Sequence, residues 1–402
     1  MLYLHATTIS QLPLELLQLI AKDIDHDPTL FSLRLVSKSL NFAVTPLVFR
    51  VVIVNDTLKS ARAVSFLQEC DESITSPVHQ LVFRGGPEQD SRLLARRMAQ
   101  EKERERTREA LKTVFSRLTK FSELKSLRFD FHDHFEDAFE MPFEMPPAPS
   151  HYLLLQQAIF RAFAANSPIS SLISLTLNNL LAIPDDICFN ADFHHFFSPL
   201  QSLDISVLSK PTKRSEYFDE LLAEFWKRSI PTIIRSAPDL STLVLRSDQP
   251  VGKRPPIPFK DLSLPRLASL TLHNFALEPS DPDADVVVFI VRHNRTLTRL
   301  ALHGCYIDKS LNGDFPYLWH SVFRLFEKEL DILREFLFEG GTAQKGGMGK
   351  QTQSDFQRDP RFRYTMSHVA FGFLPWTDEL ASECYDLPAL ECLVAVVQAR
   401  QG

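Results

Sequence analysis

The chain has 402 residues, of which 44% are hydrophobic and 23% are charged, and its 44 Lys and Arg against 50 Asp and Glu give a formal net charge of −6. This composition is typical of a folded globular protein and excludes a disordered or collagen-like chain. Because the charge is nearly balanced, we expect neither nucleic acid nor a membrane as a partner.

The cysteines favour a reducing compartment. They are odd in number and scattered, with no C-x-x-C pair: Cys70, Cys188, Cys305, Cys384 and Cys392. Neither a disulfide framework nor a zinc knuckle is therefore indicated. We expect no signal peptide, because Pro13 and Glu15 interrupt the first apolar run and no basic region precedes it, and no membrane span. The expected location is the cytoplasm, the nucleus or both.

Residues 1–50 predict three short helices. Pro13 suits the first position of one helix, and Asp27 and Pro28 open a second. Ser37 can cap a third helix, which we expect to end before Pro46. A unit this small buries little apolar surface, since below about 70 residues burial barely offsets chain entropy. Its leucines therefore need a partner, either in the rest of this chain or in another protein.

A specific motif runs through the same residues. The order L-P-x-E-[LI]-[LI] falls at residues 12–17, and L-V-S-K follows at residues 35–38, with Pro46 and Phe49 after it. Residues 9–50 thereby resemble an F-box. Leu40 and Phe42 stand where many members of that family have a tryptophan or a second basic residue.

The resemblance implies a set of residues that bind the Skp adaptor: Leu12, Pro13, Leu16, Leu17, Ile20, Leu33, Val36, Ser37 and Lys38. We expect Leu40, Phe42 and Phe49 to pack behind this surface.

Beyond a short strand at residues 51–54, the pattern L-x-x-L-x-L recurs. Its six copies are Leu124-Leu127-Phe129, Leu172-Leu175-Leu177, Leu200-Leu203-Ile205, Leu240-Leu243-Leu245, Leu267-Leu270-Leu272 and Leu297-Leu300-Leu302, and Val78-Leu81-Phe83 is weaker. The copies start 48, 28, 40, 27 and 30 residues apart, and the last extends to Cys305 and Ile307, close to a full leucine-rich repeat signature.

Helices are expected between these copies, at residues 107–120, 151–165, 217–235, 285–293 and 317–338. Alternation of strand and helix predicts an α/β fold, an irregular leucine-rich repeat solenoid with a curved parallel sheet and outer helices. Fungal F-box proteins with divergent leucine-rich C-terminal regions resemble this chain over nearly its whole length. The alternative is a non-solenoid α/β domain in which the leucine patterns arise by chance.

The predicted domains are an F-box at residues 1–50, a transition segment at 51–123 and a repeat array at 124–385, followed by a capping helix at 386–402. The transition segment includes a charged helix at 92–120, in which we expect pairs such as Glu105 with Arg108. The array carries loops at 130–150 and 339–358.

Neither loop predicts chemistry. The first contains His132, Asp133, His134 and Glu136, but an acidic, proline-rich stretch favours a loop over a metal site. The second lacks the first glycine of a phosphate-binding loop, where Gln344 stands. With no catalytic motif elsewhere, we expect neither an enzyme nor a cofactor.

Aligning the copies places polar residues in columns that would share one face of the sheet. The third column is Asp130, Asn178, Ser206, Arg246, His273 and His303, and the first ends in Arg299. Arg246, His273, Arg299 and His303 are therefore the candidate substrate-binding residues, able to donate to acidic or phosphorylated groups. The alternative is that these polar residues only keep the face soluble.

The family resemblance implies the function of a substrate receptor in a Skp/cullin/F-box ubiquitin ligase. In that family the adaptor links the receptor to the cullin and its RING subunit, and the repeats capture the protein to be ubiquitylated. The identity of that protein substrate is not indicated. The alternative function is a leucine-rich interaction scaffold that acts outside a ligase.

Overall fold

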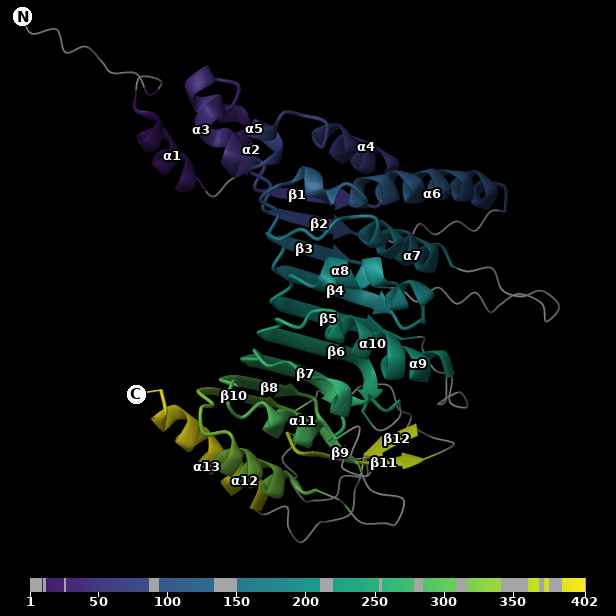
Figure 1. The fold of residues 1–402 in the computed structure, drawn as a ribbon, viewed down its shortest axis with the longest axis vertical. Coiled ribbons are helices and arrows are strands. Elements are labelled where there is room, and N and C mark those ends of the chain that lie inside the picture. The colour runs from purple at the N-terminus through teal and green to yellow at the C-terminus, as the bar shows by residue number, and fades with distance from the viewer. Residues whose placement is uncertain are drawn as a thin grey trace, which may run out of the picture.

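The computed structural model describes residues 9, 12–24, 27–86, 94–133, 150–209, 220–252, 255–277, 285–308, 315, 317–340, 361–368, 372–375 and 385–401. It shows a mixed α/β fold with a small three-helix unit at one end and a large parallel sheet with its helices beyond it (Figure 1).

The three-helix unit consists of α1 (Leu14–Lys22), α2 (Asp27–Leu33) and α3 (Lys38–Val48). Ser37 caps α3 as predicted, because its hydroxyl accepts a hydrogen bond from the backbone N–H of Leu40 at 3.2 Å. The expectation that α3 ends before Pro46 was wrong, since the helix continues to Val48. Thr45 donates its hydroxyl to the carbonyl of Asn41 at 2.6 Å, within the turn that precedes the proline.

This unit has a hydrophobic core of its own, separate from the core of the sheet. Its buried members are Leu17, Ala21, Leu30, Leu40, Ala43 and Val44. Phe49, directly after α3, packs instead against the main core, and the Arg34 guanidinium lies 4.7 Å from the centre of its ring. The unit thus joins the sheet through a short connection and packs mainly on itself.

Nine parallel strands form the large sheet, and they follow one another in chain order. They are β1 (Val51–Asn55), β2 (Gln80–Arg84), β3 (Ser126–Asp130), β4 (Ser174–Leu181), β5 (Ser202–Leu208), β6 (Thr242–Val251), β7 (Ser269–Phe275), β8 (Arg299–His303) and β10 (Glu335–Glu339). The repeated leucines align across the strands, with Leu175, Leu203 and Leu243 in one row and buried.

The sheet includes the strand predicted at residues 51–54 and the weaker copy Val78-Leu81-Phe83, and at its other end it extends beyond the last predicted copy. Val52 pairs with Leu81 at the start of the sheet, and Phe336 pairs with Leu300 at its end. The prediction of a helix at residues 317–338 was therefore wrong for its last third, because α12 ends at Glu329 and the strand β10 follows. Leu330, Leu333 and Leu337 have helical spacing, but the free edge of β8 offers backbone hydrogen bonds that favour a strand.

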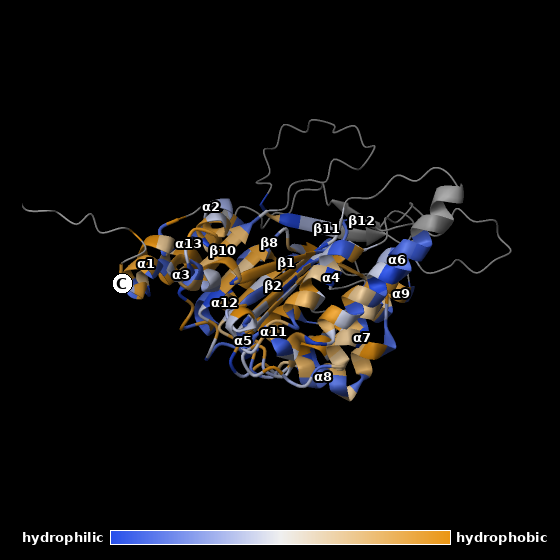
Figure 2. Ribbon diagram, turned by 90° about the horizontal axis from the view of Figure 1, so that it is seen from above, coloured by the Kyte–Doolittle hydropathy of each residue, from blue (hydrophilic) through white to orange (hydrophobic). Residues whose placement is uncertain are grey.

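Helices cover one face of the sheet, as the view from above shows for α4 and α6 to α9 (Figure 2). They are α4 (Leu58–Leu67), α5 (Glu72–Thr75), α6 (Leu94–Phe115), α7 (His151–Ala164), α8 (Ala191–Phe197), α9 (Glu220–Glu224), a π-helical turn (Phe225–Ser229), α10 (Ile230–Arg235), α11 (Val286–Arg292) and α12 (Trp319–Glu329), with short 3-10 turns at Leu118–Lys120, Asp186–Phe189 and Phe259–Asp261. The main core lies between these helices and the sheet.

The charged helix begins near where it was expected, but its ion pairs differ. α6 starts at Leu94, and Arg108 pairs with Glu101 at 3.1 Å rather than with Glu105. Arg108 is largely buried because it also contacts His151 at the start of α7. The helix is therefore solvated on one side only.

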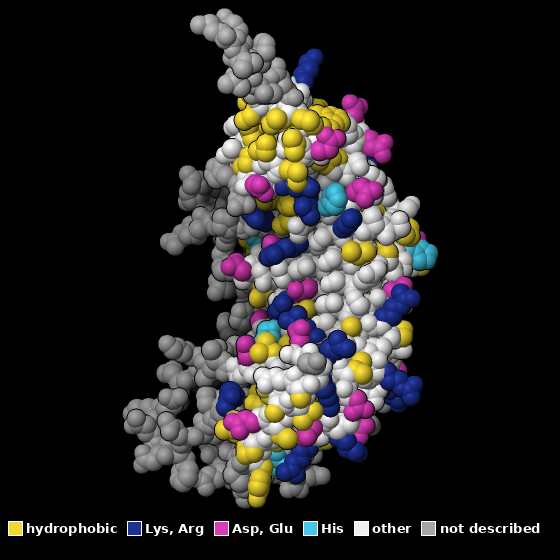
Figure 3. All heavy atoms as spheres, turned by 90° about the vertical axis from the view of Figure 1, so that its left-hand side faces the viewer, with side chains coloured by type: hydrophobic (Ala, Val, Ile, Leu, Met, Phe, Trp, Pro, Cys, Tyr) yellow, Lys and Arg dark blue, Asp and Glu magenta, His cyan; other side chains and the backbone are white. Residues whose placement is uncertain are grey.

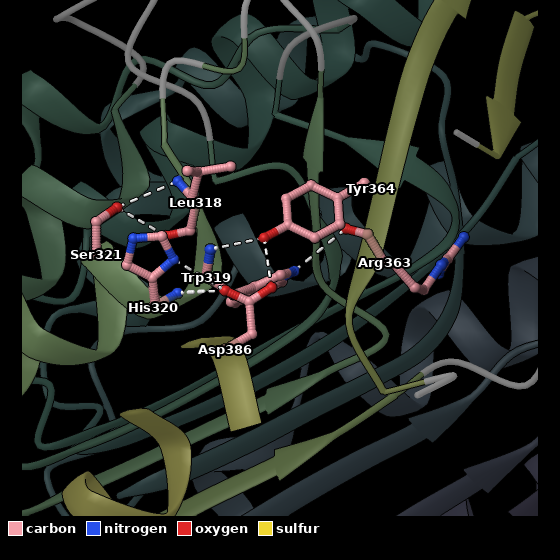
Figure 4. A network of polar contacts seen from close by, with 7 residues as sticks. All are labelled: Leu318, Trp319, His320, Ser321, Arg363, Tyr364 and Asp386. Atoms are coloured by element: carbon pink, nitrogen blue, oxygen red, sulfur yellow. Dashed lines mark hydrogen bonds and ion pairs between the residues drawn. The ribbon is translucent and has the colours of Figure 1, made fainter. Parts of the chain in front are cut away.

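Helix α13 (Asp386–Ala399) packs on α12 at the far end of the sheet, with Leu390, Leu393 and Val397 buried in the main core. A polar network holds its first turn, and Asp386 is at the centre (Figure 4). The Asp386 carboxylate accepts hydrogen bonds from the His320 backbone N–H at 2.8 Å and from the Tyr364 hydroxyl at 2.7 Å. Burial raises the pKa of Asp386 although both bonds favour its ionised form.

Tyr364 belongs to a small second sheet beside this end of the molecule. The sheet consists of β9 (Tyr306–Asp308), β11 (Arg363–His368) and β12 (Gly372–Pro375). Since the Tyr364 hydroxyl accepts from the backbone N–H of Trp319 at 3.0 Å, this sheet is tied to the start of α12.

Candidate interaction surfaces

The three-helix unit exposes an unusual share of the apolar side chains. Of the eighteen large apolar residues that the described part of the chain leaves exposed, eight fall within residues 9–42. Seven of them form what we call the apolar surface of the unit: Leu16, Leu19, Ile20, Phe31, Leu35, Val36 and Phe42. Apolar side chains gather over this unit at the top of the face in Figure 3. Concentrated exposed apolar residues mark interaction sites in stable proteins.

The structure divides the predicted adaptor-binding residues into two groups. Leu16 and Ile20 are 45% and 48% exposed, and Pro13, Val36 and Lys38 are exposed as well. The others face inward, for different reasons. Leu17 is fully buried in the unit's core, Leu12 and Leu33 are half-buried against it, and Ser37 is engaged as the cap of α3.

For four residues of the apolar surface, the sequence did not predict the exposed position that the structure shows. Phe42 was expected to pack behind the surface and is 65% exposed, so that expectation was wrong, whereas Leu40 is buried as expected. Leu19, Phe31 and Leu35 were not among the predicted adaptor-binding residues, although Leu35 begins the L-V-S-K motif. A helical wheel could have found Leu19, because it lies three residues after Leu16 on α1.

The second candidate surface is the sheet face that carries the polar columns, which we call the open face. The first column aligns as predicted from Ser126 through Ser174 and Ser202 to Arg299, and its serines are half-buried. The third column is interrupted beside Asn178, where a bulge shifts the register of β4 against β5. Asn179 takes a left-handed backbone conformation there, with φ of 57°.

The structure brings the four predicted substrate-binding residues to this face, but each has a partner. Arg246 on β6 pairs with Asp204 on the adjacent strand β5, and Arg299 pairs with Glu335 at 3.2 Å. His303 contacts Glu339 at 2.7 Å through Nδ1. The positive charge expected on this face is therefore balanced by carboxylates on the neighbouring strands.

His273 lies against His303, and the two rings are stacked with centroids 4.1 Å apart. Burial, together with His303 and Arg246, lowers the pKa of His273 to about 4. His273 is therefore neutral at pH 7 and adds no positive charge to the face. Because the two rings are nearly parallel, at 11°, their nitrogen lone pairs lie in separate planes, and the pair is not arranged to chelate one metal ion.

A buried cluster of ionisable residues lies beside the end of β1. The Asp56 side chain is 7% exposed, and the carboxylate oxygen Oδ2 lies 3.0 Å from His132 Nε2 and 3.5 Å from His151 Nε2. Arg108 can only donate to His151 Nδ1, at 3.0 Å, so in this arrangement His151 carries its proton on Nε2 and donates it to Asp56. His132, imagined as a metal ligand from the sequence, is instead a hydrogen-bond donor, and His134 and Glu136 lie outside the described residues.

This cluster predicts a dependence of stability on pH. Burial raises the pKa of Asp56, but the hydrogen bonds from His132 and His151 outweigh it and lower the pKa from 3.8 to about 2. Because the pKa is lower in the folded state, ionised Asp56 stabilises the fold at pH values above its pKa in the unfolded chain. This stabilisation is lost as the pH falls from about 4 to about 2. The shift corresponds to about 2 kcal/mol.

Urea denaturation of Asp56→Asn should show this loss at pH 7, and the difference from the wild type should shrink as the pH is lowered from 5 towards 3. Asp71→Asn, at an exposed carboxylate, is the matched control and should change the free energy of unfolding little at any pH. A deficit in Asp56→Asn that stays constant down to pH 3 would contradict the explanation.

No group of three histidine, cysteine, aspartate or glutamate residues within the described part of the chain is arranged to hold a metal ion. Burial raises the pKa of the Cys188 and Cys305 thiols to about 12, so neither is a reactive thiolate. Among the helices that the structure describes, none has the length and apolar character required to span a membrane.

Comparison with known proteins assigns no relatives: no protein-family model matches the chain, and no curated protein matches it significantly.

Proposed function

We propose that this chain is the substrate-recognition subunit of a Skp/cullin/F-box ubiquitin ligase. The observation that carries the proposal is the apolar surface of the three-helix unit, in the part of the chain that resembles an F-box. The unit has its own core, yet it leaves seven large apolar side chains exposed, and the rest of the described chain does not cover them. A partner that buries this surface accounts for its exposure in the chain alone.

The sheet region supports the second half of the proposal, an irregular leucine-rich repeat array that captures the target. Nine parallel strands in chain order, with their leucine-type residues in register, are what such an array requires. One face is covered by helices and the other presents alternating polar side chains. An array of this kind offers a long binding surface without a catalytic pocket.

The mechanism is positional. The receptor makes no covalent bond, but raises the effective concentration of a target lysine near the ubiquitin-charged enzyme that the cullin and RING subunits recruit. The adaptor and the target bind at different parts of the chain, so both can be held at once.

Co-expression of the full chain with the Skp adaptor, followed by size-exclusion chromatography, tests the proposal. We expect the two proteins to elute together at one-to-one stoichiometry. If the chain is folded and soluble alone and does not elute with the adaptor, the receptor function fails, and an interaction scaffold outside a ligase becomes the better interpretation.

A further inference from the structure

The open face ends in a pocket where it meets α13. The pocket has a volume of about 270 Å³. One wall comes from β8 and β10, and the other comes from α13 and Gln401 after it. The residues that matter below are Arg299, Glu335, Leu337, Val394 and Gln398. Among the predicted substrate-binding residues, Arg299 is the one that lines it.

We propose that this pocket anchors one large apolar side chain, of the size of Leu, Met or Phe, from an unphosphorylated polypeptide segment of the target protein. This inference rests on the proposed function and names the class of its substrate.

The size and the walls of the pocket indicate a single side chain. Pockets for drug-sized ligands and cofactors have volumes of roughly 300–1,000 Å³, and this one lies just below that range. Its apolar wall includes Leu337, which is 44% exposed although it lies in the interior of β10. Val394 opposes it from α13 and is only half-buried. Protein interfaces often concentrate binding energy in one apolar or aromatic anchor that fills such a pocket.

The rim of the pocket suits a peptide backbone. The amide of Gln398 is on the exposed side of α13 and can both donate and accept a hydrogen bond, as a backbone amide and carbonyl require. Arg299 and Glu335 are neighbours on β8 and β10, and they form an ion pair on that wall, 3.2 Å apart, with both side chains more than half exposed. This rim therefore has groups of both kinds and no net charge.

Three ion pairs on the open face disfavour a phosphorylated segment. Arg128 pairs with Asp130 and Arg246 pairs with Asp204, just as Arg299 pairs with Glu335. A phosphate would have to displace a carboxylate from a guanidinium, so it would gain little. An unmodified segment pays no such cost.

The position of the pocket is compatible with simultaneous binding of the adaptor. β1 and β10 are the first and last strands of the sheet, eight strand spacings apart. At about 4.8 Å per spacing this is about 38 Å along the sheet. A target segment held at β10 would therefore not compete with a partner of the three-helix unit, which adjoins β1.

The test is selection from a random dodecapeptide library displayed on phage, using the full chain as bait and Leu337→Arg for counter-selection. The selected peptides should share one Leu, Met or Phe, and their binding to the full chain is then measured by fluorescence anisotropy. Leu337→Arg should weaken binding at least tenfold, and so should Gln398→Arg, which places a long charged side chain on the opposite wall.

Two control variants make the result specific. Ile332→Arg changes an apolar residue that is also exposed but lies outside the pocket, and it should leave peptide affinity within twofold of the wild type. Leu16→Asp should also retain peptide binding, so a failure of adaptor binding and a failure of the pocket can be told apart. The inference is overturned if no peptide survives the counter-selection, if replacing the shared apolar residue by Ala changes nothing, or if acidic or phosphoserine-containing peptides bind better.

Discussion

Leu16→Asp is expected to abolish co-elution of the chain with the Skp adaptor, a weakening of at least about 100-fold. Leu16 is 45% exposed on α1, within the apolar surface of the three-helix unit. In a complex, the new carboxylate would be buried among apolar groups without a partner, which costs several kcal/mol. Ile20→Asp, one turn further along α1, should have the same effect.

Because Leu16 is exposed in the free chain, its replacement should change the free energy of unfolding little. A loss of adaptor binding can then be assigned to the surface itself. The secondary structure of both variants, followed by circular dichroism, should equal that of the wild type. Leu221→Asp on α9 is the matched control, because Leu221 is a leucine exposed to a similar degree in another part of the molecule. Adaptor binding retained by both Leu16→Asp and Ile20→Asp would refute the assignment of this surface. Equal loss in Leu221→Asp would mean that general unfolding is responsible.

Phe129→Ala is expected to cause the largest loss of stability of a single substitution, about 3–5 kcal/mol in the free energy of unfolding. Phe129 lies on β3 and is 1% exposed. Four other rings surround it, with centroid distances of 5.0–6.0 Å: Phe83, Phe115, Phe131 and Phe163. Truncation removes these contacts and leaves a cavity that neighbouring strands and helices cannot close without moving.

Urea denaturation followed by circular dichroism measures this loss. Phe66→Ala, at a phenylalanine that is 72% exposed on α4, is the matched control, and it should change the free energy of unfolding by no more than about 0.5 kcal/mol. If Phe129→Ala lost less than about 1 kcal/mol, the site would have to relax far more than a packed core allows.

Features that depend on local spacing could be predicted from the amino-acid sequence. Ser37 marks the start of α3 because its side chain bonds to a backbone N–H three residues away. The leucine patterns located six strands and their register, since residues two apart must face the same core and the neighbouring copies share that core. The spacing of apolar residues was therefore sufficient to predict most strands of the sheet.

Where two periods fit equally well, the sequence could not decide. Leu330, Leu333 and Leu337 fit a helix, but α12 ends before Leu330 and Leu337 lies in β10, which pairs with the edge of β8. Phe42 was expected to be covered, but α1 and α2 pack against α3 at Leu40, Ala43 and Val44, and Phe42 is left exposed.

The chemistry of the candidate surfaces depends on contacts between residues that are distant in sequence. The carboxylates that balance Arg246 and His303 lie 42 and 36 residues away in sequence, and they are neighbours only because parallel strands stack. Asp56 meets His132 and His151 for the same reason, across the ends of β1 and β3 and the start of α7. Local spacing determines which side of a helix or strand a residue faces. The order of the strands in the sheet determines which distant residues lie next to it. Ion pairs, pKa shifts and the shape of the pocket depend on those neighbours.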